Sequence, residues 1–144
     1  MNQYKYIKYG KTTYHILTDS SDIKKMIMKW IYNEVKYDHS EDPSQQWTKD
    51  WLKVIPLMKY KLEKIKLSDI KIRKDLMNYR TDNYCFKDSL KSRANEREEA
   101  YERGVSFEPL LVNSNKYELM DGYTRYVVLK KYKENKILSY VGYL

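Results

Sequence analysis

Apolar and polar residues alternate at the period of a strand in residues 3–18, and then at the period of a helix. Gly10–Lys11 divides the first stretch into two halves, so we expect a β-hairpin there. A helix follows to about Tyr37, with the polar cluster of residues 19–22 as its N-cap. Its apolar residues form a single stripe, which indicates a buried core face: Ile23, Met26, Ile27, Trp30, Ile31 and Val35.

The middle of the chain has shorter and less regular patterns. A short helix is expected over residues 44–54, ended by Ile55–Pro56 because the residue before proline is pushed out of the helical region. Residues 59–72 favour a strand, although their alternation slips once. Either a β-bulge or a later start at Glu63 would explain the slip. Residues 76–83 are rich in turn formers and predict a loop.

The last part of the chain alternates helices and strands. Residues 84–103 predict a helix capped by Asp82 or Asn83 and stopped at Gly104. We assign its charged residues to a solvated face: Glu96, Arg97, Glu98, Glu99, Glu102 and Arg103. Strands are expected at 109–112, 117–120 and 137–143, with a further helix from residue 123 to about residue 134.

Composition narrows the class of protein. The chain has 144 residues, 42% of them hydrophobic and 33% charged, which is typical of a folded domain. No apolar run is long enough to span a bilayer, and the N-terminus has no export signal, so no membrane partner is expected. A single cysteine, Cys85, excludes an internal disulfide and fits a cytoplasmic location.

The net charge of +8 is unevenly placed. Residues 53–80 hold nine Lys and Arg against three acids, which gives +6 for this segment. Such a segment favours a polyanion such as nucleic acid, although solvated lysine faces would give the same count. The candidate nucleic-acid-binding residues are Lys59, Lys61, Lys64, Lys66, Lys71, Arg73 and Lys74.

One turn near the C-terminus carries the most chemistry. In residues 121–126 a strand, a glycine turn and a helix start meet, and free N–H groups at a helix start favour anions. Gly122 would let a phosphate approach the N–H groups of Tyr123, Thr124 and Arg125, with Arg125 adding a charged contact. Alternatively, Asp121 caps the helix and Arg125 pairs with Glu118 or Glu108.

Further roles follow if a phosphate binds at this turn. Asp121 is the best-placed acid for Mg²⁺ or for activating a hydroxyl or water, and Glu108 is the second. Tyr126 or Tyr123 could stack on a base. His39, beside Glu41 and Asp42, could bind a metal, but a solvated loop histidine is the better interpretation. We expect no haem, flavin or zinc.

The order of these elements resembles the ParB/sulfiredoxin superfamily, specifically the ParB-like nuclease N-terminal domain. The similar segments are Ile65–Ile70, the Asn78–Tyr79–Arg80 loop, Gly104–Val112 and the Gly-x-x-Arg box at 122–125. The resemblance implies an α+β fold with a small mixed sheet and flanking helices over residues 63–144. Residues 1–62 would be an added hairpin and two helices packed on that core. The resemblance also implies that Arg80 reaches the phosphate from the opposite loop.

The departures from the family limit what it implies. Tyr123 stands where sulfiredoxins carry their cysteine, which argues against sulfinic-acid reduction, and Glu108 replaces the family's glutamine. The expected function is nucleotide or phosphate binding, as a Mg²⁺-dependent NTPase, phosphotransferase or nuclease acting with nucleic acid. The alternatives are a non-catalytic DNA- or protein-binding module of plasmid, phage or defence origin, and a small-metabolite kinase. The oligomeric state stays open.

Overall fold

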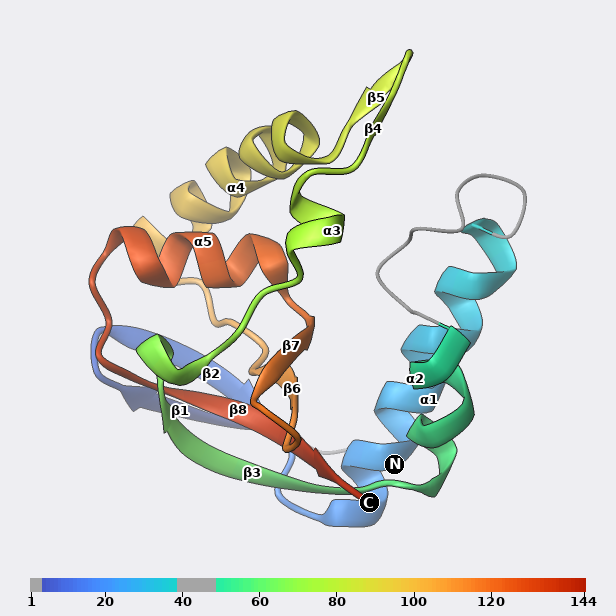
Figure 1. Cartoon of the computed structure of the whole chain (residues 1–144). Helices are drawn as coiled ribbons and strands as arrows, with labels where there is room; N and C mark the ends of the chain where they lie inside the picture. Colours follow the sequence, from blue (N-terminus) through green and yellow to red (C-terminus); the bar gives the residue numbers. More distant parts are fainter. Residues whose placement is uncertain (1–3, 39–48) are drawn as a thin grey trace.

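A computed structural model describes residues 4–38 and 49–144, and its centre is a four-stranded mixed sheet (Figure 1). The strand order is β3-β8-β6-β7, with β8 antiparallel to β3 and parallel to β6. The strands are β1 (Lys5–Tyr9), β2 (Thr12–Ile16), β3 (Lys59–Lys66), β4 (Arg80–Thr81), β5 (Tyr84–Cys85), β6 (Leu110–Asn113), β7 (Glu118–Asp121) and β8 (Lys136–Tyr143). The helices are α1 (Ser20–Asp38), α2 (Lys49–Val54), α3 (Lys74–Met77), α4 (Phe86–Glu102) and α5 (Tyr123–Lys131), with 3₁₀ turns η1 (Ile55–Leu57) and η2 (Leu67–Asp69). The expected α+β class is confirmed.

Both faces of the sheet are buried, each by a different pair of helices. Leu110 and Val112 of β6 pack with α4 and α5, whereas Leu111 between them packs with α1 and α2. Successive side chains on a strand point to opposite faces, so a fully apolar strand is what a two-sided sheet requires. Figure 1 shows the two helical layers on opposite sides of β6 and β7.

Strand β3 corrects the expectation of a bulge or a late start. It pairs with β8 without interruption from Lys59 to Lys66, and it ends there rather than at residue 72. Tyr60 belongs to the core under α1 and α2, while Ile65 belongs to the core under α4 and α5. The slip in the alternation therefore comes from one regular strand burying opposite faces at its two ends.

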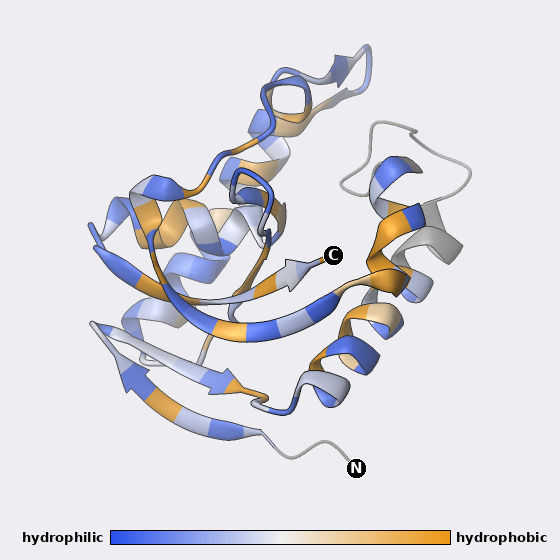
Figure 2. Cartoon of the chain, turned by 60° about the horizontal axis from the view of Figure 1, so that its bottom comes forward, coloured by the Kyte–Doolittle hydropathy of each residue, from blue (hydrophilic) through white to orange (hydrophobic). Residues whose placement is uncertain are grey.

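The N-terminal predictions are confirmed where the structure describes them. The hairpin β1–β2 turns at Gly10, and the Asp19 carboxylate accepts the Asp22 N–H at 3.0 Å at the start of α1. Figure 2 shows hydrophobic and hydrophilic segments alternating along α1, as in an amphipathic helix. Helix α2 begins at Lys49. The start expected at residue 44 and the histidine at position 39 lie outside the described residues.

The segment between α3 and α4 differs from the prediction. Residues 76–83 are not a plain loop, because α3 reaches Met77 and a small hairpin, β4–β5, follows. Asp82–Asn83 form its two-residue turn and do not cap a helix; α4 begins at Phe86, after Cys85. Asn and Asp are favoured both in two-residue turns and at helix N-caps, so these residues also predicted a cap. Gly104 stops α4 with a φ of 75°, as expected.

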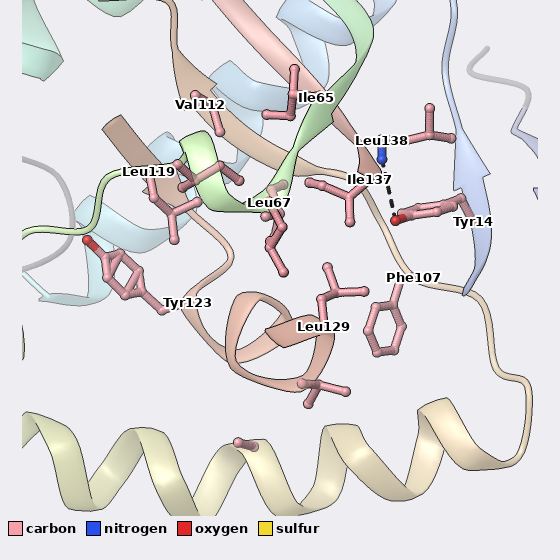
Figure 3. Packing of buried hydrophobic residues seen from close by; sticks show 14 of the residues in the cluster. Tyr14, Ile65, Leu67, Phe107, Val112, Leu119, Tyr123, Leu129, Ile137 and Leu138 are labelled. Carbon is pink, nitrogen blue, oxygen red and sulfur yellow. Dashed lines mark hydrogen bonds between the residues drawn. The ribbon is translucent and has the colours of Figure 1, made fainter. Parts of the chain in front are cut away.

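The β1–β2 hairpin is tied to the core. Tyr14 is 1% exposed, and its hydroxyl accepts the Leu138 N–H at 3.4 Å (Figure 3). Strand β2 also forms backbone hydrogen bonds with Phe107, so it pairs with the segment that precedes β6. The division of the chain into an added N-terminal segment, residues 1–62, and a ParB-like domain, residues 63–144, stays a prediction. In the described part of the chain, each helix is too short or too polar to cross a membrane.

Candidate functional site

A cleft of about 310 Å³ lies where β6 begins and β7 ends, between the two helical layers. Its position follows from the sheet: β6 and β7 are antiparallel, and Leu111 pairs with Asp121, so the start of one strand adjoins the end of the other. Helix α5 begins directly after β7. The lining residues are Trp30, Phe86, Arg93, Arg97, Glu108, Asp121, Gly122, Tyr123, Thr124 and Arg125.

Gly122 gives the turn into α5 its shape. Its φ of 105° is a backbone conformation that favours glycine. A Cβ at this position would lie 2.6 Å from Leu110 Cδ2 and 2.8 Å from Arg125 Nη2. The residue is the N-cap of α5 without a side-chain capping bond, so Asp121 is not the cap. The first-turn N–H groups of Tyr123, Thr124 and Arg125 lie beyond the reach of intrahelical acceptors.

Arg125 is held between two carboxylates. Its Nη2 lies 3.4 Å from Asp121 Oδ2, and its Nη1 lies 3.8 Å from Glu108 Oε2. Nη1 also donates to the Glu108 backbone carbonyl at 3.2 Å. All three side chains are at most one-fifth exposed, so the guanidinium is screened from bulk water. The pairing of Arg125 with Glu108 is one that the sequence left open as an alternative.

The Glu108 carboxyl has a raised pKa. Burial raises the pKa of Glu108, and the Asp121 carboxylate adds to the rise, although Arg125, Tyr4 and Arg97 oppose it. The Tyr4 hydroxyl donates to Glu108 Oε1 at 3.3 Å. Because burial, and after it the neighbouring Asp121 carboxylate, oppose a charge on Glu108, its deprotonated form is disfavoured relative to an ordinary surface glutamate.

Two further arginines line the cleft and were not identified from the sequence. Arg93 and Arg97 come from α4, and both are exposed, as the assignment of Arg97 to a solvated face expected, yet both line the cleft. A second cavity of about 390 Å³ adjoins the first, since Arg93, Arg97 and Thr124 line both. Partial burial and then the charges of Arg125 and Arg97 lower the pKa of His15, so these two arginines both act on the same ring near the cleft.

A sequence signal for these arginines existed. Leu90 and Ala94 mark the buried stripe of α4, and Arg93 and Arg97 each follow one of them by three residues. Residues three apart share a helix face, so both arginines border the apolar stripe rather than oppose it. Their guanidiniums lie 5.9 and 5.7 Å from the rings of Phe86 and Phe107.

The structure brings together most of the predicted phosphate-site residues, but not all. Asp121, Gly122, Thr124, Arg125 and Glu108 share the cleft. Arg80 is exposed on the β4–β5 hairpin, which projects away from the sheet in Figure 1, and it does not line the cleft.

The two tyrosines considered for base stacking lie elsewhere or are closed off. Tyr123 is 4% exposed, its ring meets Phe86 edge to face at 5.8 Å, and its hydroxyl accepts the Arg73 N–H. Tyr126 lines a different cavity, beside Leu67 and Lys130. Neither ring presents an open face to the cleft.

The candidate nucleic-acid residues divide into two groups. Lys59, Lys61, Lys64 and Lys66 are exposed along β3, an edge strand of the sheet, and Lys71 and Lys74 are exposed beyond it. Arg73 is buried: its guanidinium lies 2.7 Å from Asp75 and 5.5 Å from the ring of Trp51. Its position indicates a structural role, apart from the surface lysines.

The acids of the cleft fit a metal only in part. Among the described residues, there is no group of three His, Cys, Asp or Glu side chains that could hold an ion. Asp121 and Glu108 are two carboxylates, and both already face Arg125. Mg²⁺ is commonly held by one or two carboxylates together with substrate phosphates, so Asp121 could ligate the ion only alongside a phosphorylated ligand.

Comparison with known proteins finds solved structures that resemble part of this chain. No family model matches the sequence, and no curated protein matches it. One structurally similar protein is the C2221 crystal form of a pNOB8-like ParB N-domain, at 20% identity over 60% of this chain with a TM-score of 0.43. A second pNOB8-like ParB N-domain structure gives 23% identity over 58% of this chain and a TM-score of 0.39.

The chain spans 31% and 28% of the length of the two matched chains. At this identity and TM-score we draw no conclusion about activity from them. In its described residues the fold is that of a small α+β domain, and the cleft is the basis for a functional proposal.

Proposed function

We propose that the cleft at the start of α5 binds the phosphate group of a small phosphorylated ligand. The observation that carries the proposal is the convergence of three arginines, Arg93, Arg97 and Arg125, on a glycine turn whose helix start has no side-chain cap. Guanidinium groups make charge-assisted and often bidentate contacts with phosphate oxygens. Backbone N–H groups of the first helical turn add donors on the same side.

On binding, phosphate oxygens would replace the two carboxylates that now face Arg125. Arg125 now faces the carboxylates of Asp121 and Glu108 at 3.4 and 3.8 Å, distances longer than a good charge-assisted hydrogen bond. A phosphate has more acceptor oxygens than either distant carboxylate and can engage the guanidinium at closer range. The two acids then become available to a Mg²⁺ ion that arrives with the phosphate, and Asp121 would be its protein ligand.

The reaction, if the ligand is turned over, would be phosphoryl transfer or hydrolysis. The chain's own contribution would be to position the phosphate on Arg125 and the helix start, and to hold a proton or ion at Asp121. Glu108, whose pKa is raised by burial, is the second proton carrier in the cleft. Phosphate binding is the primary proposal, and it holds with or without turnover.

Isothermal titration with inorganic pyrophosphate tests the binding proposal. The wild-type protein should bind it, and Arg125→Ala should weaken binding at least about tenfold, because removing a charged donor from a partly buried site costs roughly 1.5–3 kcal/mol. Arg103→Ala is the matched control, since Arg103 is exposed at the end of α4 and does not line the cleft. Equal binding by all three proteins would refute the proposal.

A second candidate function, binding of nucleic acid, is favoured by the surface of β3. Four of its eight residues are exposed lysines, and two of them lie over tyrosine rings: Lys61 over Tyr143 at 5.5 Å and Lys64 over Tyr9 at 4.9 Å. Lysines together with tyrosines suit a phosphodiester backbone with accessible bases. Lysines also protect edge strands from aggregation, which is the competing explanation.

Salt dependence separates these two explanations for β3. A polyanion site should lose affinity for single-stranded DNA steeply between about 50 and 200 mM salt. Replacing Lys59, Lys61, Lys64 and Lys66 by Gln should remove that binding and leave pyrophosphate binding intact. If the fourfold variant binds DNA like the wild type, or merely aggregates more, the lysines protect the edge and the second function is wrong.

A further inference from the structure

Trp30 is an aromatic side chain in the cleft that comes from outside the phosphate-binding layer. It lies on α1, which packs on the opposite face of the sheet from α4 and α5, yet it lines the same cleft as Arg125. The residue was expected to be pure core. Instead, it packs against the α1–α2 core while remaining half-buried, so part of its side chain is left toward the cleft.

The other aromatic residues of the cleft cannot serve as a platform. Phe86 is 7% exposed and Tyr123 is 4% exposed, and their rings pack edge to face against each other. Among the lining residues, Trp30 is therefore the aromatic side chain with accessible surface. An accessible indole beside an anion site is suited to a planar ring joined to a phosphate.

We propose that Trp30 selects a nucleotide for the cleft by stacking on its base, while the phosphate lies on Arg125 and the start of α5. This inference rests on the proposed phosphate site and adds the residue that would recognise the base of a nucleotide. The arrangement gives the ligand two ends, an apolar one on α1 and an anionic one on α4 and α5. The cleft volume of about 310 Å³ is at the lower end of the range for small-molecule sites.

The two ends of the ligand come from different parts of the chain. The anion side lies in residues 86–125, which resemble the ParB N-domain, whereas Trp30 lies in the N-terminal segment that has no part in that resemblance. Ligand choice would thus depend on an element added to the fold. Removing the indole should change selectivity for the base without changing affinity for the phosphate.

The test compares ligands that differ by a base. Affinities of AMP, CMP and ribose 5-phosphate are measured by titration calorimetry for the wild type, Trp30→Leu, Arg125→Ala and Tyr32→Ala. Leu keeps an apolar side chain for the α1 core, and Tyr32 is a matched control because it is 68% exposed on α1 and outside the cleft. A wild-type preference for AMP or CMP over ribose 5-phosphate of about 5- to 100-fold is expected from base stacking.

Each outcome decides between the two proposals. Support requires that Trp30→Leu reduces this preference to about twofold or less, with ribose 5-phosphate affinity retained, while Tyr32→Ala keeps it. Equal binding of nucleotide and ribose 5-phosphate by the wild type overturns the role of Trp30 but leaves the phosphate site standing. So does an equal loss of all ligands in Trp30→Leu. Failure of the wild type to bind any of the three overturns the phosphate site, and the inference with it.

The indole resonance of Trp30 in the wild type is a second test, which does not depend on whether the variant folds. Trp30 carries one indole N–H, and ring currents from a stacked base shift the resonances of protons near its face. On addition of AMP, its indole resonance should shift, and ribose 5-phosphate should leave it nearly unchanged. An identical response to both ligands would contradict stacking.

Discussion

Arg125 Nη2 in the first turn of α5 lies 3.4 Å from Oδ2 of Asp121, the last residue of β7, across the N-cap glycine Gly122. Arg125, the proposed hydrogen-bond donor to phosphate, is therefore paired with an acid of the preceding strand. Its second partner is Glu108, at 3.8 Å. Two carboxylates around one guanidinium leave the group of three with one net negative charge. The acids thus compete with any anionic ligand, and their removal should be visible in binding.

Glu108→Gln should strengthen pyrophosphate binding by about 3- to 10-fold, because it removes a competing charge worth roughly up to 1 kcal/mol or slightly more in a partly exposed pair. The amide keeps the size of the side chain, and the bond from Arg125 to the residue 108 carbonyl is retained. Titration calorimetry at pH 7 measures the effect. Glu102→Gln, on the exposed side of α4, is the control and should bind like the wild type.

The same variant should also be more stable than the wild type at neutral pH. The folded-state pKa of Glu108 is raised above its value of 4.5, so its stabilising contribution is present below pH 4.5 and is lost as pH rises through the folded pKa. The gain in the free energy of unfolding should therefore vanish toward pH 4. A gain that is the same at pH 4 and pH 7 would contradict burial as the cause.

Gly122→Ala should destabilise the protein by about 2 kcal/mol or more, since strain at positive φ costs roughly 1–2 kcal/mol and the new Cβ also meets Leu110 and Arg125. Gly104→Ala offers a matched comparison: its φ is 75°, but no atom lies within 4 Å of the added Cβ. Urea unfolding of both variants measures the difference. Equal costs at the two glycines would contradict a steric contribution from Leu110 and Arg125.

Glu134→Ala should loosen the β1–β2 hairpin and cost roughly 2–4 kcal/mol of unfolding free energy, given about 1.5–3 kcal/mol per bond to a charged group. Glu134 is 9% exposed and accepts the Lys11 N–H at 2.7 Å, the Thr12 hydroxyl at 3.0 Å and the Tyr101 hydroxyl at 3.3 Å. Hydrogen exchange at the Lys11 amide should accelerate most. Unchanged protection there would mean that the hairpin is held by other contacts.

His15 should make the fold less stable below pH 6.5. Partial burial, then Arg125 and Arg97, lower its folded-state pKa, so the unfolded chain takes up a proton first as pH falls below 6.5. The groups around its ring are Ser106, Tyr4 and Tyr6, besides these two arginines. His15→Gln should flatten the decline of unfolding free energy between pH 7.5 and 5.5. His39 is present in both proteins, so its contribution cancels.

The elements with a clear period were predictable from the sequence. The apolar stripe of α1 and the glycine stop of α4 were found because each is encoded by residues close together in the chain. The continuity of β3 was missed because its apolar residues face two different cores, which no local pattern reveals. Asp82–Asn83 suits a turn as well as a cap, and only pairing of β4 with β5 decides between them.

Only the part of the candidate site at the glycine turn was predictable from the sequence. The sequence indicated Gly122, Thr124 and Arg125, since a glycine turn at a helix start is a local signal. Arg93, Arg97 and Trp30 come from other elements, and their approach depends on how α1 and α4 pack around the sheet. Arg80 was placed there by resemblance, yet it lies on a projecting hairpin outside the cleft.

Amide chemical shifts on titration with pyrophosphate test the central claim most directly. In ¹H–¹⁵N spectra of the wild type, the largest changes are expected at the N–H groups of Gly122, Tyr123, Thr124 and Arg125, with side-chain changes at Arg97. The lysines of β3 should respond weakly, and their response should disappear with added salt. Changes confined to β3, or none at the start of α5, would contradict a phosphate site in this cleft.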